Sequence, residues 1–534
     1  MRLDERLAEE GLVGLRAVGH SAHSREAASE SLVDRSIALA IVAAIATFVT
    51  HIAVAGGYGY QRDELYFISC ARHLAWGYVD QPPLIAVIAR IVLALFGDSL
   101  YAIRLLPAIA AAATVVVTGR MVRRFGGGFI AQSLAMIGIA LAPFFLAVGN
   151  LLTMNAFEPL LWLGAAYLFV KADESDRPAL WASLGVVSGL GLVNKYSMFF
   201  FLGSSLVAIA LTPSRRSLAR PGFALAVALA ALIVAPTLAW QAQHGWPQLA
   251  VLHDAAATKN VVVGPLGFYA QQVLMMNPLT APMWIAGLVT LFRAPRARAF
   301  RWYGIAYAIL SALYLVLGAK VYYLAPIYPV LFAAGAASIE PHLARVRFAT
   351  IAYPALLLVF GFAIAPEAYP LLPLPTFLRY EHVLDFRNIK MEKHPEGRVP
   401  QHFADMLGWN TLVASLARAN DALSPSERRD AVVLTHDYGQ ASAVDFLGAK
   451  VGLPRAISGH NNYFLYGTRG ASGRVVLAIG YDPASLGREF ASVERVGSYH
   501  DDYVLPDSNN LAIYKCTHPR ERIADWWPQM RRYL

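Results

Sequence analysis

Residues 36–56 read SIALAIVAAIATFVTHIAVAG, an apolar run without acidic residues, lysine or arginine. About 20 apolar residues in an α-helix cross the roughly 30 Å hydrocarbon core of a bilayer. Stretches that meet or approach this length follow at 100–119, 129–148, 155–171, 181–194, 197–211, 222–240, 267–291, 302–318, 323–339 and 348–366. The pattern predicts a polytopic α-helical membrane protein with about eleven transmembrane helices.

The composition of the chain supports the same class. Of 534 residues, 57% are hydrophobic and 15% are charged, whereas soluble globular proteins carry about 25% charged residues. A disordered chain, a coiled coil and an ordinary soluble enzyme are therefore excluded. The net charge of +9 does not indicate nucleic-acid binding, because the basic residues fall between apolar runs, where they act as orientation signals.

The segment PPLIAVIARIVLALFG (82–97) decides the orientation. At about 1.5 Å per residue it reaches roughly 24 Å, which is too short to cross the bilayer. If it does not cross, the basic loops share the side of the N-terminal tail; if it crosses, they violate the positive-inside rule. We therefore expect an interfacial or re-entrant helix, a cytosolic tail and an outer C-terminus. The loops concerned contain Arg120, Arg123 and Arg124, then Arg215, Arg216 and Arg220, then Arg293, Arg296, Arg298 and Arg301, and finally Arg345 and Arg347.

Beyond Pro366 the chain has the polarity of a soluble domain. The runs DAVVLTH (430–436), RVVLAIGY (474–481) and NNLAIYKC (509–516) predict strands, and 438–450 and 483–491 have helical periodicity. We divide the chain into a cytosolic N-terminal tail (1–35), a transmembrane domain (36–366) with its first outer loop at 57–99, and an extracytoplasmic α/β domain (367–534).

Cysteine and histidine residues give weak signals. Cys70 and Cys516 both lie outside in this topology, so a disulfide between them is an open alternative. His436, Asp437 and His460 fit ordinary loop and strand-end positions better than a metal pair. No residue cluster demands a metal, and we assign no cofactor, although a divalent metal requirement stays open.

Acidic residues in the first outer loop are the candidates for chemistry. Asp63 and Glu64 fit either a solvated helix start, stabilised by the helix dipole, or a general base. Arg62 fits an ion-pair partner of Glu64 or a snorkelling residue equally well. Asp80 precedes two prolines and fits a turn cap or a polar group in a cavity.

Lysines and tyrosines border the same face. Lys195 and Lys320 each end a span beside aromatic residues, so they fit snorkelling side chains or a pair that binds a phosphate anion. An aromatic belt at the interface accounts for many tyrosines. These are Tyr58, Tyr60, Tyr66, Tyr78, Tyr322 and Tyr323.

Four motifs in order carry a resemblance. RDELYF…ARHLAWGYVDQPPL, NKYS, GPLGFYAQQ…NPLTAP and GAKVYYLAPIYPVL resemble the bacterial family-39 glycosyltransferases, relatives of dolichyl-phosphate-mannose protein mannosyltransferases and of lipid A aminoarabinose transferase. LTHDYGQASAVDFLG and ISGHNNYFLYG resemble the C-terminal domains of bacterial members. The resemblance covers most of residues 36–534 and implies the GT-C fold.

The resemblance also implies roles for residues. Asp63 matches the acidic residue that acts as base in the family, Glu64 completes an Asp-Glu pair, and Lys320 falls where members contact the carrier phosphate. We place Arg62, Lys195, Tyr322 and Tyr323 with Lys320 around the donor phosphate, and Asp80, Gln81 and Tyr60 as substrate-positioning residues. Aminoarabinose transferases have Glu-Lys-Pro-Pro where this chain has Asp80-Gln81-Pro82-Pro83, so the cation of that motif is lost.

The expected activity is transfer, with inversion, of a sugar from a polyprenyl-phosphate carrier to a hydroxyl of an envelope acceptor. This acceptor is a glycolipid, lipid A, a polysaccharide or a protein, on the outer face of the bacterial inner membrane. A phosphate leaving group needs little acid assistance, so the reaction requires one base and cations for the departing phosphate. The alternative is a non-catalytic transporter, flippase or binding protein for lipid-linked sugars.

Overall fold

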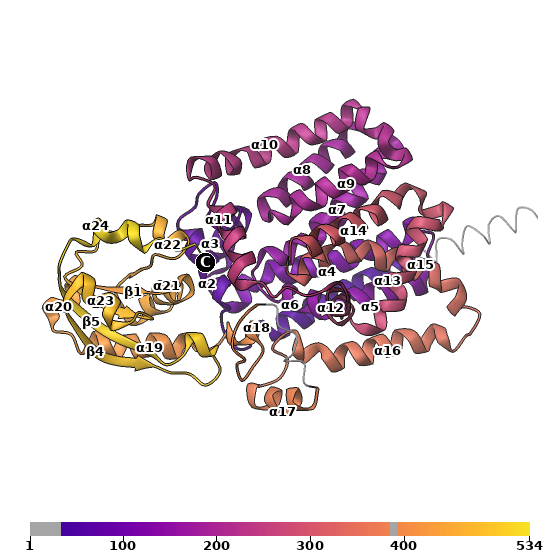
Figure 1. Cartoon of the computed structure of the whole chain (residues 1–534). Helices are drawn as coiled ribbons and strands as arrows, with labels where there is room; N and C mark the ends of the chain where they lie inside the picture. Colours follow the sequence, from indigo (N-terminus) through magenta and orange to yellow (C-terminus); the bar gives the residue numbers. More distant parts are fainter. Residues whose placement is uncertain (1–33, 385–391, 534) are drawn as a thin grey trace, which may run out of the picture.

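The computed structural model describes residues 34–384 and 392–533. The expected cytosolic tail lies almost entirely outside these residues. A helical bundle forms one part of the molecule, and a smaller α/β domain sits at one end of the bundle (Figure 1). Both parts of the expected fold class, the helical membrane domain and the C-terminal α/β domain, are confirmed.

Most helices of the bundle come from the apolar runs of the sequence. They are Asp34–Val54, α2 (Arg62–Arg72), α3 (Leu84–Phe96), α4 (Leu100–Arg124), α5 (Phe129–Ala140), α6 (Pro143–Gly149), α7 (Met154–Ser175), α8 (Pro178–Asn194), α9 (Ser197–Ala210), η1 (Pro213–Ala219), α10 (Pro221–Gln243), α11 (Pro247–Asp254), η2 (Ala255–Lys259), α12 (Pro265–Met275), η3 (Pro278–Thr280), α13 (Ala281–Arg293), η4 (Pro295–Phe300), α14 (Arg301–Val316), η5 (Val321–Ile327), α15 (Tyr328–Leu343), α16 (Ala349–Ile364) and η6 (Ala365–Glu367).

Length and composition separate these helices into two groups. Among the described residues, six helices are long and apolar enough to cross a membrane. This number rises to nine if each of three sharply bent helix pairs is counted as one span. The two further spans predicted from sequence are α7, which carries Lys171, Asp173 and Glu174 near its end, and α8, which has only 17 residues. The chain is a multi-pass membrane protein, and the count of eleven spans stays a prediction.

The segment 82–97 forms a helix, α3, of 13 residues. At 1.5 Å per residue this helix is about 20 Å long, less than the hydrocarbon thickness. It packs against α2 and α4, and Val87, Ile91 and Leu95 on its outer face are exposed. The structure therefore agrees with a helix too short to cross, and its placement at the interface stays a prediction.

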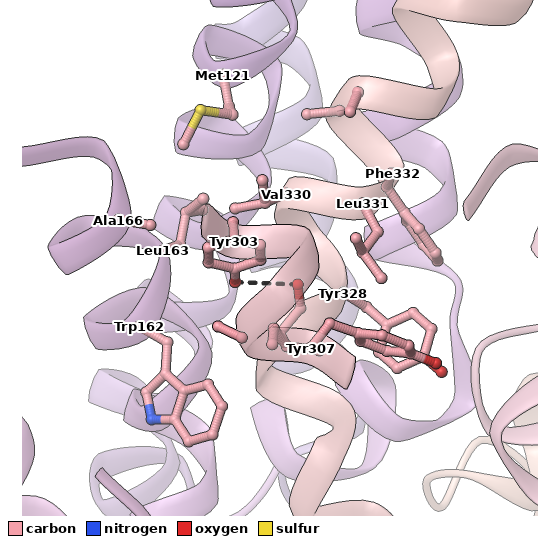
Figure 2. Packing of buried hydrophobic residues seen from close by; sticks show 14 of the residues in the cluster. Met121, Trp162, Leu163, Ala166, Tyr303, Tyr307, Tyr328, Val330, Leu331 and Phe332 are labelled. Carbon is pink, nitrogen blue, oxygen red and sulfur yellow. Dashed lines mark hydrogen bonds between the residues drawn. The ribbon is translucent and has the colours of Figure 1, made fainter. Parts of the chain in front are cut away.

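The bundle core is rich in aromatic side chains. Tyr303 and Tyr328 are completely buried among apolar residues of α4, α7, α14 and α15. The Tyr303 hydroxyl donates a hydrogen bond of 3.1 Å to the carbonyl oxygen of Ile327 (Figure 2). Aromatic side chains bury large areas, and a buried tyrosine usually finds a partner for its hydroxyl.

The C-terminal domain is built on a five-stranded mixed sheet of order β2-β1-β3-β5-β4. The parallel strands β2, β1 and β3 are followed by antiparallel β5 and β4. Its elements are α17 (Leu374–Leu384), α18 (Gln401–Ala404), α19 (Trp409–Asp421), α20 (Pro425–Asp430), β1 (Ala431–Thr435), α21 (Tyr438–Phe446), η8 (Gly448–Val451), β2 (Ala456–Ile457), α22 (Asn462–Leu465), β3 (Val475–Ile479), α23 (Pro483–Glu489), β4 (Phe490–Tyr499), η9 (Pro506–Ser508), β5 (Leu511–Pro519), α24 (Ile523–Trp526) and η10 (Trp527–Met530).

The three strands predicted from sequence are confirmed as β1, β3 and β5, and both helical patterns are confirmed as α21 with η8 and as α23. The expected end of the second pattern was wrong by two residues, because Phe490 already pairs with Pro519 on the neighbouring strand. Strand β4 lies at the sheet edge and is mostly solvent-exposed, so it lacks the continuous apolar run that marks β1 and β3.

One hydrophobic core joins the two parts of the molecule. Leu65 and Ile68 of α2, and Ile85 of α3, belong to the same buried cluster as Ala441 of α21 and Leu477 of β3. Because burial of apolar surface stabilises a structure in proportion to its area, the first outer loop and the α/β domain support each other. The α/β domain is therefore packed on the loop that carries the candidate acid.

Candidate active site

Helix α2 begins with a capping box that separates the two acidic residues. The Gln61 side chain accepts a hydrogen bond of 2.6 Å from the Asp63 backbone N–H, and the Glu64 carboxylate accepts one of 2.9 Å from the Gln61 N–H. Both interactions satisfy N–H groups that a helix start leaves without partners. Asp63 and Glu64 are consecutive, so their side chains leave the helix in different directions.

Glu64 points into the protein. It is fully buried and forms an ion pair with Arg104, which is 1% exposed. One carboxylate oxygen accepts from Arg104 Nε at 3.0 Å and from the Leu152 N–H at 2.9 Å. The other accepts from Arg104 Nη2 at 2.8 Å and from the Gln61 N–H. The sequence predicts a catalytic Asp-Glu pair around Asp63, but Glu64 does not line the cavity described below, and its expected ion-pair partner Arg62 lies elsewhere.

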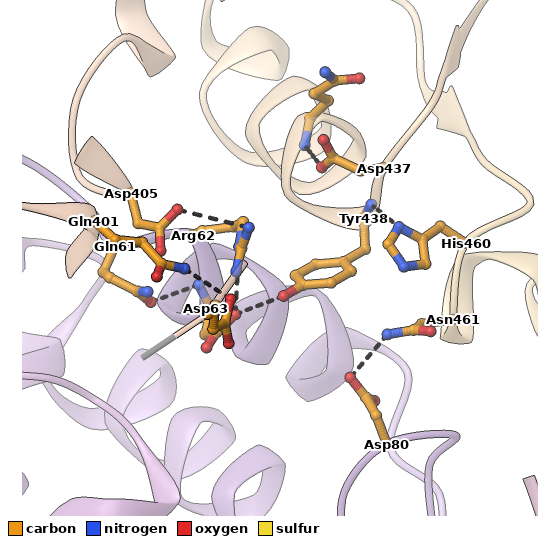
Figure 3. A network of polar contacts seen from close by, with 12 residues as sticks. Gln61, Arg62, Asp63, Asp80, Gln401, Asp405, Asp437, Tyr438, His460 and Asn461 are labelled. Carbon is orange, nitrogen blue, oxygen red and sulfur yellow. Dashed lines mark hydrogen bonds and ion pairs between the residues drawn. The ribbon is translucent and has the colours of Figure 1, made fainter. Parts of the chain in front are cut away.

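Asp63 points toward the α/β domain and is 40% exposed. Its Oδ1 atom accepts a hydrogen bond of 2.8 Å from the Tyr438 hydroxyl and lies 3.8 Å from Arg62 Nε (Figure 3). Tyr438 is the first residue of α21, so the domain directly orients the candidate base. Burial, offset by the charge of Arg62, raises the pKa of Tyr438 well above its usual value, and its hydroxyl stays protonated as a donor.

Arg62 is fixed between two elements of the α/β domain. Its guanidinium lies 5.6 Å from the Tyr438 ring centre and 3.6 Å from Asp405 Oδ1, and its backbone N–H donates to the Asp405 carbonyl oxygen at 2.8 Å. Gly439 permits this approach, because a Cβ atom there would lie 2.6 Å from Arg62 Cγ. Burial raises the pKa of Asp405 to about 6 despite the opposing effect of Arg62.

A cavity of about 400 Å³ opens beside these residues. Its polar end is formed by Arg62, Asp63, Lys320, Glu392 and Asp405 together with Gln61, His394 and Gln401. Its other walls are apolar side chains of α6, of the bent pair α12 and η3, and of α16. These are Phe144, Ala147, Val148, Leu274, Met275, Pro278, Phe360 and Ile364. The cavity is amphipathic, with a charged head and a hydrophobic channel among membrane helices.

Lys320 and Glu392 form the second charged group of the cavity. The Lys320 ammonium contacts Glu392 Oε1, and Lys259 Nζ lies 3.5 Å from the same oxygen. His394 Nε2 lies 3.0 Å from the other oxygen. Although burial raises the pKa of Glu392, His394 and the cations outweigh it and hold this pKa far below its usual value. Three cationic groups therefore converge on one anion.

The pKa values of the neighbouring cations are shifted in different directions. Hydrogen bonds to Asp507 and then to Glu392 raise the pKa of His394 to about 9, so the ring is protonated at neutral pH. Burial lowers the pKa of Lys320, but Tyr323 and Glu392 outweigh it and the net shift is upward. Burial and the charge of Arg62 lower the pKa of Lys259.

Lys195 lies behind the cavity wall. Its ammonium donates to Asn155 Oδ1 at 2.6 Å and to Glu158 Oε2 at 3.0 Å, and it stands 5.4 Å and 4.5 Å from the ring centres of Tyr322 and Tyr323. Tyr322 lines the cavity, whereas Lys195 and Tyr323 do not. The structure thus brings Arg62, Lys320 and Tyr322 to the cavity and places Lys195 and Tyr323 in the layer that supports it.

The expected substrate-positioning residues lie away from the cavity. Asp80 accepts hydrogen bonds of 2.9 Å from the Tyr66 hydroxyl and from the Asn461 side chain, and burial raises its pKa to about 6. Gln81 is buried beside Cys70, to whose Sγ it donates at 3.4 Å. The Tyr60 hydroxyl donates to the Asp98 carbonyl oxygen at 2.5 Å. These contacts tie the first outer loop to itself and to the α/β domain.

The remaining histidines and cysteines have structural surroundings. Both cysteines are free and buried, in separate clusters. His460 Nδ1 accepts from the Tyr438 N–H at 3.3 Å, and His436 contacts Arg532. Within residues 34–384 and 392–533, no group of three or more histidine, cysteine, aspartate or glutamate side chains is arranged to hold a metal ion.

Four residues of the site were missed by sequence reasoning. Asp405, Glu392 and His394 lie in stretches without any motif, and only the folded chain brings them to the cavity. Tyr438 belongs to the string LTHDYGQASAVDFLG, whose likeness to other C-terminal domains was the one available signal. The α/β domain is therefore part of the cavity wall.

Comparisons with known proteins found two sequence matches. A family model described as dolichyl-phosphate-mannose-protein mannosyltransferase matches residues 80–240. The lipid A galacturonosyltransferase RgtD of Rhizobium johnstonii is 29% identical over 245 residues, which make up 44% of this chain and 50% of that protein. The chain thus matches about half the length of this curated relative.

Solved structures show the same fold over nearly the whole chain. The crystal structure of ArnT from Cupriavidus metallidurans bound to undecaprenyl phosphate aligns with a TM-score of 0.57 at 15% identity. The apo state of ArnT aligns with a TM-score of 0.56 at 14% identity. Each alignment covers 89% of this chain and 97% of the ArnT chain. The chain therefore has the fold of the ArnT structures, and its sequence matches cover residues 80–240 for the family model and 44% of the chain for RgtD.

Proposed function

We propose that the protein is a glycosyltransferase that moves a sugar from a polyprenyl-phosphate carrier to a hydroxyl of an envelope glycolipid. The observation that carries the proposal is the amphipathic cavity, in which Asp63 and Lys320 share a polar end that continues into an apolar channel. A lipid-linked sugar has the same division, with a sugar phosphate at one end and a hydrocarbon chain at the other. The channel lies between α6, α12 and α16, where a lipid chain can reach the bilayer.

Lys320 provides the main contact for the donor phosphate. In the structure its ammonium is neutralised by Glu392, which also contacts Lys259 and His394. A phosphate that enters this position meets the same donors, because ammonium and imidazolium groups bind phosphate and carboxylate oxygens alike. Glu392 thus marks the position that we assign to the phosphate, and donor binding moves this carboxylate aside.

Asp63 serves as the general base. It takes the proton of the acceptor hydroxyl while the acceptor oxygen bonds to the anomeric carbon. The bond between this carbon and the phosphate oxygen breaks, and its electron pair leaves with the phosphate, whose charge the cations stabilise. One attack from the face opposite the leaving group inverts the anomeric carbon. Double displacement needs two carboxyl groups about 5 Å apart across the sugar, and Glu64 is buried against Arg104.

The relatives guide the choice of substrates. RgtD is a lipid A galacturonosyltransferase by name, and the ArnT structure holds undecaprenyl phosphate. A polyprenyl-phosphate uronic acid and a lipid A acceptor are therefore the first pair to test. We further propose that the cavity faces the outer side of the bacterial inner membrane, as the positive-inside rule indicates for the arginine-rich loops.

The test is sugar transfer by purified protein in lipid nanodiscs. We expect Asp63→Asn to lower kcat by about 10²–10⁴-fold, the usual contribution of a positioned base, with unchanged binding of undecaprenyl phosphate. Asp98→Asn is the matched control, because this aspartate is about half exposed, pairs with Lys450 and does not line the cavity. Full transfer by Asp63→Asn would refute the base assignment. Carrier binding without transfer from any polyprenyl donor would favour a transporter or binding protein.

A further inference from the structure

A second cavity, of about 300 Å³, lies at the opposite end of α2 from the candidate base. It is enclosed by the end of α2, by α21 and by the segment around β2. Its basic lining residues are Arg72, His73, Arg455 and Arg469, and Asp445 is the acidic residue among the lining residues. Asp63 and Arg72 lie nine positions apart on one helix, which corresponds to about 13 Å along its axis. The two cavities are therefore separate sites on the same helix.

The second cavity carries excess positive charge. Asp445 is an ion-pair partner of Arg469, which neutralises it. Arg72 donates to the Asp445 carbonyl oxygen at 3.1 Å, and its guanidinium lies 5.5 Å from the Phe446 ring centre. The carboxylate that acts on its charge, Asp98, forms its ion pair with Lys450. Arg455 is exposed and has no hydrogen-bond or ion-pair partner for its side chain in the described part of the chain. Within the described residues, the Arg72 and Arg455 guanidinium groups thus have no ion-pair partner of their own, and an anion in the cavity can supply one.

A histidine also lines the cavity. The His73 ring stacks on Tyr466 with 4.2 Å between ring centres, and its Nδ1 lies 3.1 Å from the Ser69 carbonyl oxygen. The Nδ1–H therefore donates to this carbonyl oxygen, and the guanidinium groups are the donors left for an anion. Guanidinium groups present several donors in a planar fork that matches phosphate oxygens. The cavity therefore favours a phosphate over a neutral sugar.

Exposed apolar side chains next to the cavity favour a position at the surface of the bilayer. Leu74 and Trp76 follow directly after His73 and are 52% and 66% exposed. Tryptophan is enriched at membrane–water interfaces. A ligand that combines an anionic headgroup with acyl chains fits both the arginines and these apolar side chains.

We propose that this second cavity binds the phosphate headgroup of an anionic membrane lipid, and that it is distinct from the site of sugar transfer. The ligand is defined by its chemistry, a phosphodiester that joins the headgroup to a diacylglycerol. Binding at the end of α2 anchors this helix, and with it the α/β domain, to the membrane surface. The proposal does not depend on the proposed function.

Lipid binding by the full chain in detergent tests the proposal. The probe is dioctanoyl phosphatidylglycerol, with dioctanoyl phosphatidylcholine and inorganic phosphate as comparisons, and native mass spectrometry measures the bound fraction. We expect the double variant Arg72→Gln/Arg455→Gln to weaken phosphatidylglycerol binding by at least tenfold. Arg455→Gln alone, whose side chain has no partner to lose, should weaken it by a smaller factor and fold normally.

Two controls locate the binding. Arg474→Gln removes an exposed arginine of the same domain that lies outside both cavities, and should leave binding unchanged. Lys320→Gln alters the first cavity and should also leave this binding unchanged. Wild-type affinity in both Arg455→Gln and the double variant would overturn the proposal, as would equally tight binding of phosphatidylcholine. If inorganic phosphate bound as tightly as the lipid, the ligand of this cavity would be a soluble phosphate and not a lipid headgroup.

Discussion

Replacing Glu64 by glutamine separates a structural carboxylate from a catalytic one. Each Glu64 oxygen accepts two hydrogen bonds, one from Arg104 and one from a backbone N–H, of Leu152 or of Gln61. A glutamine of the same shape has one oxygen and one NH₂ group. In either orientation its NH₂ group faces two donors, so two hydrogen bonds are lost and the Arg104 charge has no counter-ion.

The cost follows from burial. Arg104 and Glu64 are 1% and 0% exposed, and removing one partner of such a buried pair costs about 3–5 kcal/mol. For domains of 150–250 residues, 1 kcal/mol shifts the unfolding temperature by about 2–4 °C, so we expect Glu64→Gln to lower it by about 5 °C or more. Glu64→Gln/Arg104→Met removes both charges and should recover part of this loss, because replacing a whole buried pair by apolar groups is often neutral.

The assay is thermal unfolding in nanodiscs, followed by tryptophan fluorescence, with transfer activity measured below the transition. Glu174→Gln is the matched control, since its ion pair with Arg124 is exposed and is worth about 0–1 kcal/mol. Glu64→Gln should retain transfer activity per folded molecule, whereas Asp63→Asn should retain stability and lose activity. A Glu64→Gln variant with wild-type stability and no activity would refute the structural role and restore Glu64 as a base.

Three further changes probe other parts of the site. Lys320→Gln should raise KM for the donor about 10- to 100-fold, because a hydrogen bond to a charged group contributes about 1.5–3 kcal/mol, and steady-state kinetics measure this effect. Gly439→Ala should lower kcat/KM about tenfold, or about 1.4 kcal/mol, because its Cβ displaces Arg62; an unchanged rate contradicts the role of Arg62. The pKa of His394 is raised to about 9 from 6.5, so its stabilising charge is fully present below pH 6.5 and is lost as pH rises toward 9. The unfolding temperature of the wild type should therefore fall as the pH rises over this range. A His394→Gln variant should lack this part of the pH dependence.

Local patterns were sufficient for the helical and sheet framework. The run 36–56 and the strands around Val433 and Leu477 are apolar over lengths that match a membrane span or a buried strand, and such patterns depend on no distant residue. Helix α7 was likewise predicted as a span, at 155–171, because its charged residues lie near its end and leave the apolar run intact. Edge strand β4 shows the limit of this approach, because its exposed face carries no apolar signal.

The set of residues that line the cavity could not be predicted from sequence, because the folded chain brings them together. Glu392 and Lys320 are 72 positions apart, and Tyr438 and Asp63 are 375 apart. No periodicity connects residues at such separations. The pair Asp63-Glu64 was identified from sequence. The different roles of the two residues depend on Arg104, which lies inside an apolar run. An arginine in that position fits a snorkelling residue equally well until its partner is known.

Helix α2 links the chemistry to the α/β domain. Its first turn presents Asp63 to the cavity while Glu64 fixes the same turn to α4 through Arg104. Tyr438 and Asp405, both from the α/β domain, then fix the orientation of Asp63 and Arg62. A domain that served only as a spacer would not need its buried core to include residues of α2, as it does here. A displacement of α21 relative to α2 would therefore move Tyr438 away from Asp63, the residue that we propose as the base.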